Sequence, residues 1–133
     1  MELDESAWRQ KLGDERYAVC REGATEAPFS GAYWNHYEDG CYRCAACSAL
    51  LFDSAHQYDS GSGWPSFDRA LGRSVDEQVD HRYGMRRLEI VCAACRSHLG
   101  HVFEDGPATT GRRFCVNSRS LVFEGRPSKQ EPS

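Results

Sequence analysis

The chain has 133 residues, enough for one domain with a single modest core. Sixteen Lys and Arg residues against twenty Asp and Glu residues give a formal net charge of −4, and basic residues cluster only in short pairs, which argues against nucleic acid as a partner. The N-terminus is charged throughout, and no run approaches the roughly eighteen apolar residues of a membrane helix. We therefore expect a soluble, monomeric, cytoplasmic protein with no membrane association.

The first predicted element is a short amphipathic helix over residues 4–15, where Trp8 and Leu12 stand four apart among charged residues. We assign residues 1–16 to an N-terminal helical segment. From residue 17 onward, glycines and other turn-forming residues separate short apolar runs such as 88–91 and 121–123. This pattern predicts a mainly β, antiparallel domain over residues 17–124. Residues 125–133 are polar with two prolines, which predicts a flexible tail.

Two CAAC boxes form the strongest motif in the chain, with the spacing C-x2-C-x44-C-x2-C. Each box follows a short predicted strand and precedes a leucine, so the two turns would face each other as a zinc-ribbon-like corner. Four thiolates saturate Zn²⁺ and leave no position open for substrate, which predicts one structural zinc ion per chain. Its ligands would be Cys44, Cys47, Cys92 and Cys95.

Two other interpretations of these cysteines stay open. A CAAC box also suits a redox dithiol of the thioredoxin type, although a single box in an α/β pattern would be expected for that chemistry. Cys41 forms a further C-x-x-C with Cys44. We prefer Cys44 with Cys47 because that pair matches the second box in its letters and in the leucine that follows.

A single cysteine stands apart in the segment RFCVNS. In a strand, Phe114 and Val116 would point to one face and Arg113, Cys115 and Asn117 to the other. The apolar face is then filled without the thiol, which favours a nucleophile over a packed core cysteine. Since an ordinary thiol is only a few per cent ionised at neutral pH, we expect the Arg113 guanidinium or a histidine to favour the reactive thiolate.

Two more segments offer partners for this nucleophile. In HLGHVF, His98 and His101 lie three apart around a glycine, and each is either structural, a metal ligand or part of an active site. In GSGWPSF, Trp64 is held between a glycine and a proline in a predicted loop. There it either covers the core or forms an apolar wall for a small ligand group.

In order and spacing, the paired boxes with GSGWPSF, HLGHVFEDGP and RFCVNS resemble the B-type methionine sulfoxide reductases, from about Tyr17 to Phe123. The resemblance implies two antiparallel sheets forming a partly open barrel, with short helices on the N-terminal side and a structural zinc ion. It also implies thiol-dependent reduction of methionine-R-sulfoxide, free or in oxidised proteins, and hence protein repair under oxidative stress.

The same resemblance implies the catalytic roles. Cys115 would attack the sulfoxide sulfur and become a sulfenic acid, with Asn117 beside it. Oxide is a poor leaving group, so a donor must meet the oxygen as the S–O bond breaks. His101 is our first candidate for that donor, and Arg113 or water is the alternative.

For the substrate, the resemblance implies that the ring of Trp64 receives the methyl group, with His98, Phe67 and Tyr83 as further substrate-binding residues. Tyr83 departs from the family, which often has histidine at this position, and a phenol donates a hydrogen bond but shuttles no proton near neutral pH. His81 is a candidate to compensate.

A second departure concerns regeneration of the nucleophile. Many family members carry a resolving cysteine where this chain has Ser62, so the usual disulfide with Cys115 cannot form. We expect the sulfenic acid to be resolved by Cys20, by Cys41, or by an external thiol such as a thioredoxin-like reductant, with Cys20 favoured because Cys41 lies close to the zinc boxes.

Two other functions compete with this hypothesis. A non-catalytic zinc-ribbon binding module would need only the CAAC boxes, but it leaves the isolated thiol unexplained. A cysteine hydrolase would use Cys115 with a histidine and Asn117. Such nucleophiles commonly lie at a helix N-terminus or a sharp turn, whereas Cys115 is predicted to lie in a strand.

Overall fold

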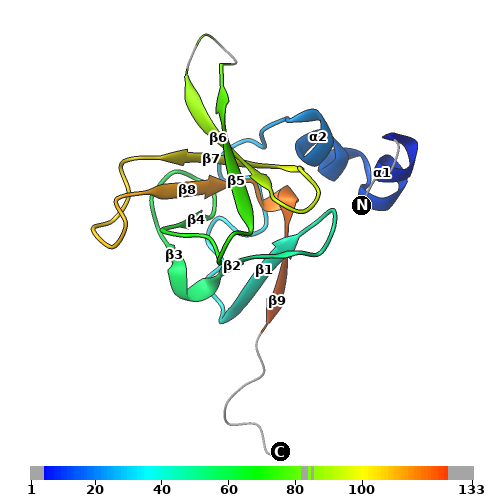
Figure 1. The fold of residues 1–133 in the computed structure, drawn as a ribbon. Coiled ribbons are helices and arrows are strands. Elements are labelled where there is room, and N and C mark those ends of the chain that lie inside the picture. Colours follow the sequence, from blue (N-terminus) through cyan, green and yellow to red (C-terminus); the bar gives the residue numbers. More distant parts are fainter. Residues whose placement is uncertain (1–4, 82–83, 85, 126–133) are drawn as a thin grey trace, which may run out of the picture.

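The protein is described by a computed structural model that covers residues 5–81, 84 and 86–125. Its strands form two antiparallel sheets (Figure 1). The three-stranded sheet has the order β2 (Leu50–Asp53), β1 (Gly40–Cys44) and β9 (Leu121–Gly125). The six-stranded sheet has the order β3 (Gln57–Tyr58), β4 (Ser66–Phe67), β8 (Arg113–Val116), β7 (His98–Phe103), β6 (Arg87–Cys92) and β5 (Val75–Asp80). The two predicted sheets are confirmed, whereas the partly open barrel stays a prediction.

The short N-terminal helices that the resemblance implied are confirmed, whereas the single helix predicted over residues 4–15 is not. The N-terminal segment forms two helices, α1 (Glu5–Leu12) and α2 (Asp14–Glu22), separated by Gly13 at a φ of 80°. Helix α2 extends the helical region well beyond residue 16 because Tyr17, Val19 and Cys20 are buried on the sheet domain. The period of these apolar residues is weak, so the sequence pattern gave little sign of the second helix. Figure 1 shows both helices on one side of the sheets.

The core lies between the two sheets and combines residues from both. Phe52 of β2 stacks on Phe67 of β4 with ring centroids 4.4 Å apart, and Tyr42 of β1 meets Phe67 edge-on at 5.3 Å. From β8, Phe114 and Val116 are also buried in this cluster. The apolar face of β8 therefore points to the core, as its alternating sequence predicted.

Strands β7 and β8 approach each other very closely beside Cys115. A Cβ atom on Gly100 would lie 1.9 Å from the Cys115 carbonyl oxygen, so no side chain fits at this position. The glycine of HLGHVF thus lets the histidine strand lie against the cysteine strand. Two shorter connections, the 3-10 helices η1 (Ser54–His56) and η3 (Ser118–Ser120), complete the described elements.

No helix among the described residues is long and apolar enough to cross a membrane. Tyr83 and the predicted tail from residue 126 onward lie outside the described residues, and Gly125 is the last residue of β9.

Candidate active site and metal centre

Cys115 lies on the face of the six-stranded sheet that points away from the core. In the antiparallel register it is paired directly with His101 of β7, and paired residues of neighbouring strands point to the same face. A cavity of about 380 Å³ opens over this face. Five of the predicted site residues line it: Trp64, His101, Arg113, Cys115 and Asn117. Ser62, Arg87 and Phe103 are among the other lining residues.

The environment of the Cys115 thiol differs from what we expected. Burial raises the pKa of Cys115 above its ordinary value of 9.0, while the Ser62 hydroxyl and the charge of Arg113 act in the opposite direction. The Ser62 oxygen lies 3.8 Å from the sulfur. Arg113 does favour the thiolate, as predicted, but desolvation outweighs it, so this cavity holds Cys115 as a thiol.

Arg113 is itself held in place on two sides. Its guanidinium donates to the Asp105 carboxylate at 2.9 and 3.2 Å, and it lies over the Phe103 ring at 4.5 Å from the centroid. The carboxylate raises the pKa of Arg113, so the guanidinium is a permanent positive charge at the cavity wall.

His101 is paired with a buried carboxylate. Its Nε2 lies 2.8 Å from Asp80 Oδ2 of β5, and because an ionised carboxylate only accepts, Nε2 donates. Burial lowers the pKa of His101 although Asp80 opposes the shift. The imidazole is therefore neutral near pH 7, a form suited to accept a proton before it donates one.

Trp64 and Asn117 are positioned by the same residue, Glu26. The Trp64 indole Nε1 donates to the Glu26 carbonyl at 3.0 Å, and the Glu26 backbone N–H donates to Asn117 Oδ1 at 3.0 Å. Asn117 also donates through Nδ2 to the Leu99 carbonyl at 3.0 Å. Both polar atoms of the Asn117 amide are thus hydrogen-bonded to backbone groups. The side chain links the segment at Glu26 to the end of β8.

The four predicted metal ligands converge at a place that does not line the cavity. The sulfurs of Cys44, Cys47, Cys92 and Cys95 all lie within 4.8 Å of one another. The Cys44–Cys95 and Cys47–Cys92 sulfurs are 3.7 and 3.6 Å apart. Four sulfurs at about 2.3 Å from a tetrahedral ion would be roughly 3.8 Å apart, so this cluster could hold a metal ion such as zinc.

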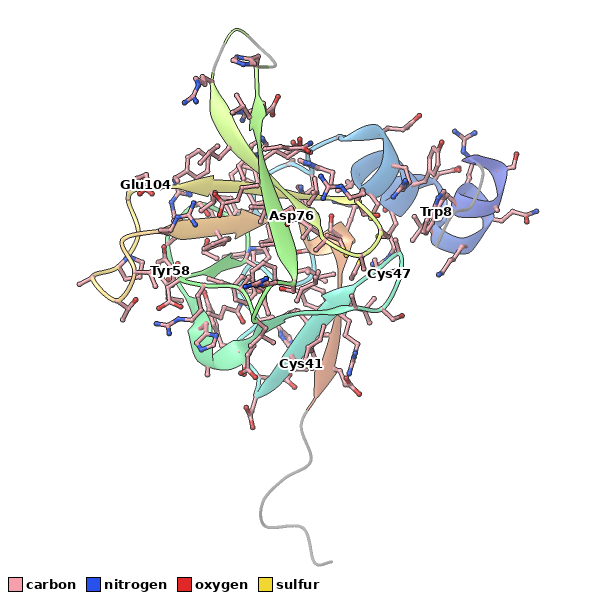
Figure 2. The ribbon with its side chains drawn as sticks, viewed as in Figure 1. Trp8, Cys41, Cys47, Tyr58, Asp76 and Glu104 are labelled. Atoms are coloured by element: carbon pink, nitrogen blue, oxygen red, sulfur yellow. The ribbon has the colours of Figure 1, made fainter. Side chains whose placement is uncertain are left out.

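The two boxes repeat the same backbone geometry, as the sequence repeat suggested. The N–H groups of Ser48 and Arg96 each donate at 2.8 Å to the carbonyl of the first cysteine of their box. Both residues have positive φ, 70° and 67°. Cys41 lies outside the cluster. Figure 2 shows it along β1, away from the turn that carries Cys47.

The comparisons with known proteins agree with this arrangement. The SelR domain model matches residues 12–125, which include every residue of the cavity and of the sulfur cluster. The chain belongs to the SelR-domain family. Among its SelR-domain relatives, a Herminiimonas arsenicoxydans protein named peptide methionine sulfoxide reductase MsrB is 52% identical over 96% of this chain and 93% of its own length.

Two further SelR-domain relatives carry the same name. The Thiobacillus denitrificans protein is 52% identical over 90% of this chain and 91% of its own length. The Cellvibrio japonicus protein is 46% identical over 98% of this chain and 94% of its own length.

Within this SelR-domain fold, two of the predicted substrate residues lie behind the cavity wall. Phe67 is fully buried between the sheets. His98 is buried next to His101, with ring centroids 5.6 Å apart, and its Nδ1 lies 2.5 Å from Glu89 Oε2. Each of the two motifs therefore supplies one residue that lines the cavity and one that is buried. In GSGWPSF these are Trp64 and Phe67, and in HLGHVF they are His101 and His98.

The two candidate resolving cysteines also lie outside the cavity wall. Cys20 is buried on α2 against the Arg119 carbonyl, and burial raises the pKa of its thiol to about 11. Cys41 lies 3.6 Å from a Glu124 carboxylate oxygen on the three-stranded sheet. Sequence reasoning missed Asp80 and Glu26, since both act through partners far away in the chain.

Proposed function

We propose that this chain reduces methionine-R-sulfoxide to methionine through Cys115, which becomes a sulfenic acid. The observation that carries the proposal is the cavity in which the Cys115 thiol, the Trp64 ring and the Asp80-paired His101 meet. The preference for the R epimer rests on the family resemblance.

The reaction needs a thiolate that the resting cavity disfavours. When substrate enters, the neutral imidazole of His101 takes the Cys115 proton, and Asp80 stabilises the imidazolium that forms. The positive charge of Arg113 stabilises the thiolate. The apolar ring of Trp64 receives the methyl group and holds the sulfoxide sulfur near the nucleophile.

The Cys115 thiolate then attacks the sulfoxide sulfur while the imidazolium returns the proton to the oxygen. The S–O bond breaks, and the oxygen ends on Cys115. The balance is one thiol and one sulfoxide giving one sulfenic acid and one thioether, with Cys115 oxidised by two electrons and the substrate reduced by two. Here His101 acts first as base and then as the proton donor that the sequence suggested.

The sulfenic acid is resolved by a thiol from outside the chain. The Ser62 side chain, whose oxygen lies 3.8 Å from the Cys115 sulfur, offers no thiol, and neither Cys20 nor Cys41 lines the cavity. An external thiol of thioredoxin type therefore forms a mixed disulfide with Cys115 and releases water, and a second thiol then frees Cys115. Resolution by Cys20 or Cys41 would require movement of α2 or of β1.

The sulfur cluster holds a structural zinc ion in this proposal. Cys44, Cys47, Cys92 and Cys95 are its ligands, and the ion stabilises the fold without taking part in the reaction. The buried Cys95 carries a lowered pKa because the Cys44 and Cys92 thiols donate to it, so the cluster favours a thiolate, the form that binds a cation.

A single-turnover experiment tests the proposal. Fully reduced protein is mixed with R- or S-methionine sulfoxide without reductant, and methionine and remaining thiols are counted. We expect one methionine per chain from the R epimer only, the loss of one thiol, and none of this from Cys115→Ser. Loss of two thiols would instead identify an internal resolving cysteine. No methionine from either epimer would refute the reductase and favour the zinc-ribbon binding module.

A further inference from the structure

An exposed aromatic side chain is held beside the cavity in an unfavourable backbone conformation. Phe29 has 56% of its surface exposed, the largest exposed fraction among the big apolar residues described. Its φ of 64° is left-handed, which a bulky residue rarely adopts. Such conformations persist only where the surroundings enforce them, and they concentrate at ligand-binding sites.

The contacts that enforce this conformation come from the cavity loop itself. The Phe29 backbone N–H donates to the Gly63 carbonyl at 2.7 Å, and a Cβ on Gly63 would lie 3.0 Å from the Phe29 ring. Gly63 stands between Ser62 and Trp64, which both line the cavity. Three residues before Phe29, the Glu26 carbonyl accepts from the Trp64 indole. Residues 26–29 therefore run along the edge of the cavity.

Phe29 is part of a larger aromatic surface, which we call the aromatic rim and define as Phe29, Trp34 and Tyr37. Trp34 packs edge-on against Phe29 with ring centroids 4.9 Å apart. Tyr37 is 49% exposed, and its hydroxyl lies 3.5 Å from the Trp34 carbonyl. Burial raises the pKa of Tyr37, and the charge of Asp59 acts in the same direction.

We infer that the aromatic rim binds apolar side chains that flank the oxidised methionine in a polypeptide substrate. This rests on the proposed function. The cavity admits the sulfoxide side chain, whereas the backbone of a protein substrate stays outside and must cross the edge of the cavity. Aromatic rings at this edge gain free energy by burying apolar side chains that flank the sulfoxide. A free amino acid has no flanking residues to reach the rim.

The test compares two R-sulfoxide substrates with dithiothreitol as reductant: N-acetylmethionine sulfoxide, and a heptapeptide whose sulfoxide is flanked by leucines. Phe29→Asn removes the ring but keeps a residue that tolerates the left-handed conformation. We expect the ratio of kcat/KM on the peptide to kcat/KM on the small substrate to fall about tenfold, and Phe29→Tyr to restore it. Val122→Asn, at a 43% exposed apolar position on β9, should leave the ratio unchanged.

The outcomes separate the two proposals. If wild-type protein reduces neither substrate, the proposed function fails. If it reduces both and Phe29→Asn leaves the ratio unchanged, the aromatic rim does not bind substrate. If the variant instead slows turnover only when a thioredoxin replaces dithiothreitol, the rim docks the reductant and the inference is overturned.

Discussion

At Cys115, two opposing effects set the reactivity of the thiol: burial raises its pKa and the Arg113 charge lowers it. The Arg113→Met substitution removes the charge but keeps most of the side-chain volume. The pKa of Cys115 should therefore rise further, and alkylation of Cys115 by iodoacetamide at pH 8 should slow about threefold or more. In wild-type protein the alkylation rate should climb with pH through 9, because the raised pKa keeps Cys115 protonated below that range. Arg112→Met is the matched control, since Arg112 pairs with Glu77 at 2.7 Å. Equal rates in both variants would contradict this balance.

The Ser62 hydroxyl marks the place from which an internal thiol could reach Cys115. We expect Ser62→Cys to form a disulfide with Cys115 after one turnover, which raises the loss from one thiol to two. Mass spectrometry of the oxidised, unreduced protein would identify the cross-link. Ser60→Cys is the control, because the Ser60 hydroxyl is directed to the Ser62 and Ser66 hydroxyls, which lie 2.9 and 2.7 Å away. A Ser62→Cys protein that still loses one thiol would show that the two positions cannot be bridged.

How much of the site could be predicted depends on how close together in the sequence the interacting residues lie. The two faces of β8 follow from alternation over a few residues, so Cys115 and Arg113 were placed on the cavity side correctly. The Asp80–His101 pair joins residues 21 positions apart, and the Glu26–Asn117 contact joins residues 91 apart. Only strand pairing and loop packing bring these residues into contact, so no local sequence pattern predicts the two contacts.

At the scale of elements, the loop between α2 and β1 supports the cavity from outside the sheet. Glu26, only 5% exposed, accepts from the backbone N–H groups of Ser118 and Arg119 at 3.0 Å each, directly after Asn117. Through its own backbone it also holds Trp64 and Asn117. Glu26 thus holds Trp64 through its backbone and the residues after β8 through its carboxylate.

Glu26→Gln should weaken the hydrogen bonds to Ser118 and Arg119, because an amide offers one acceptor oxygen where the carboxylate uses two. We expect the free energy of unfolding, measured by urea titration, to fall by about 2 kcal/mol. Glu22→Gln, on the exposed end of α2, is the control and should leave this free energy nearly unchanged. The charge of Glu26 also raises the pKa of Cys115, so the variant should alkylate faster at pH 8, opposite to Arg113→Met. Slower alkylation would show that the effect of Glu26 on the thiol is not electrostatic.

The elements themselves were predicted unevenly. Strands β6 and β9 and both CAAC turns follow from short apolar runs and turn residues, and these were found. Helix α2 was not, since its charged sequence shows little helical periodicity and its stability comes from burying Tyr17, Val19 and Cys20 against the domain. Figure 1 shows the helix beside the sheets that supply that packing.

For the whole molecule, the sulfur cluster connects the two sheets. Cys44 and Cys47 come from the β1–β2 turn of the three-stranded sheet, and Cys92 and Cys95 from the β6–β7 turn of the six-stranded sheet. The six-stranded sheet carries Cys115 and His101, while the three-stranded sheet covers its apolar face. An ion held by both turns would therefore keep the two sheets together behind the cavity, although it would lie outside the cavity itself.

We expect purified protein to contain one zinc ion per chain, with a contribution to folding on the order of 10–16 kcal/mol if the site behaves like small zinc modules. Cys95→Ser should lose the metal, melt at a much lower temperature and lose sulfoxide reduction, although position 95 touches no substrate. Cys41→Ser is the matched control, because Cys41 offers the same C-x-x-C spacing to Cys44 but lies outside the cluster, and it should keep the metal, the melting temperature and the activity. Metal content unaltered in Cys95→Ser, or lost in Cys41→Ser, would reassign the ligands. A metal-free Cys95→Ser protein that melts like wild type would mean that burial alone holds the sheets together.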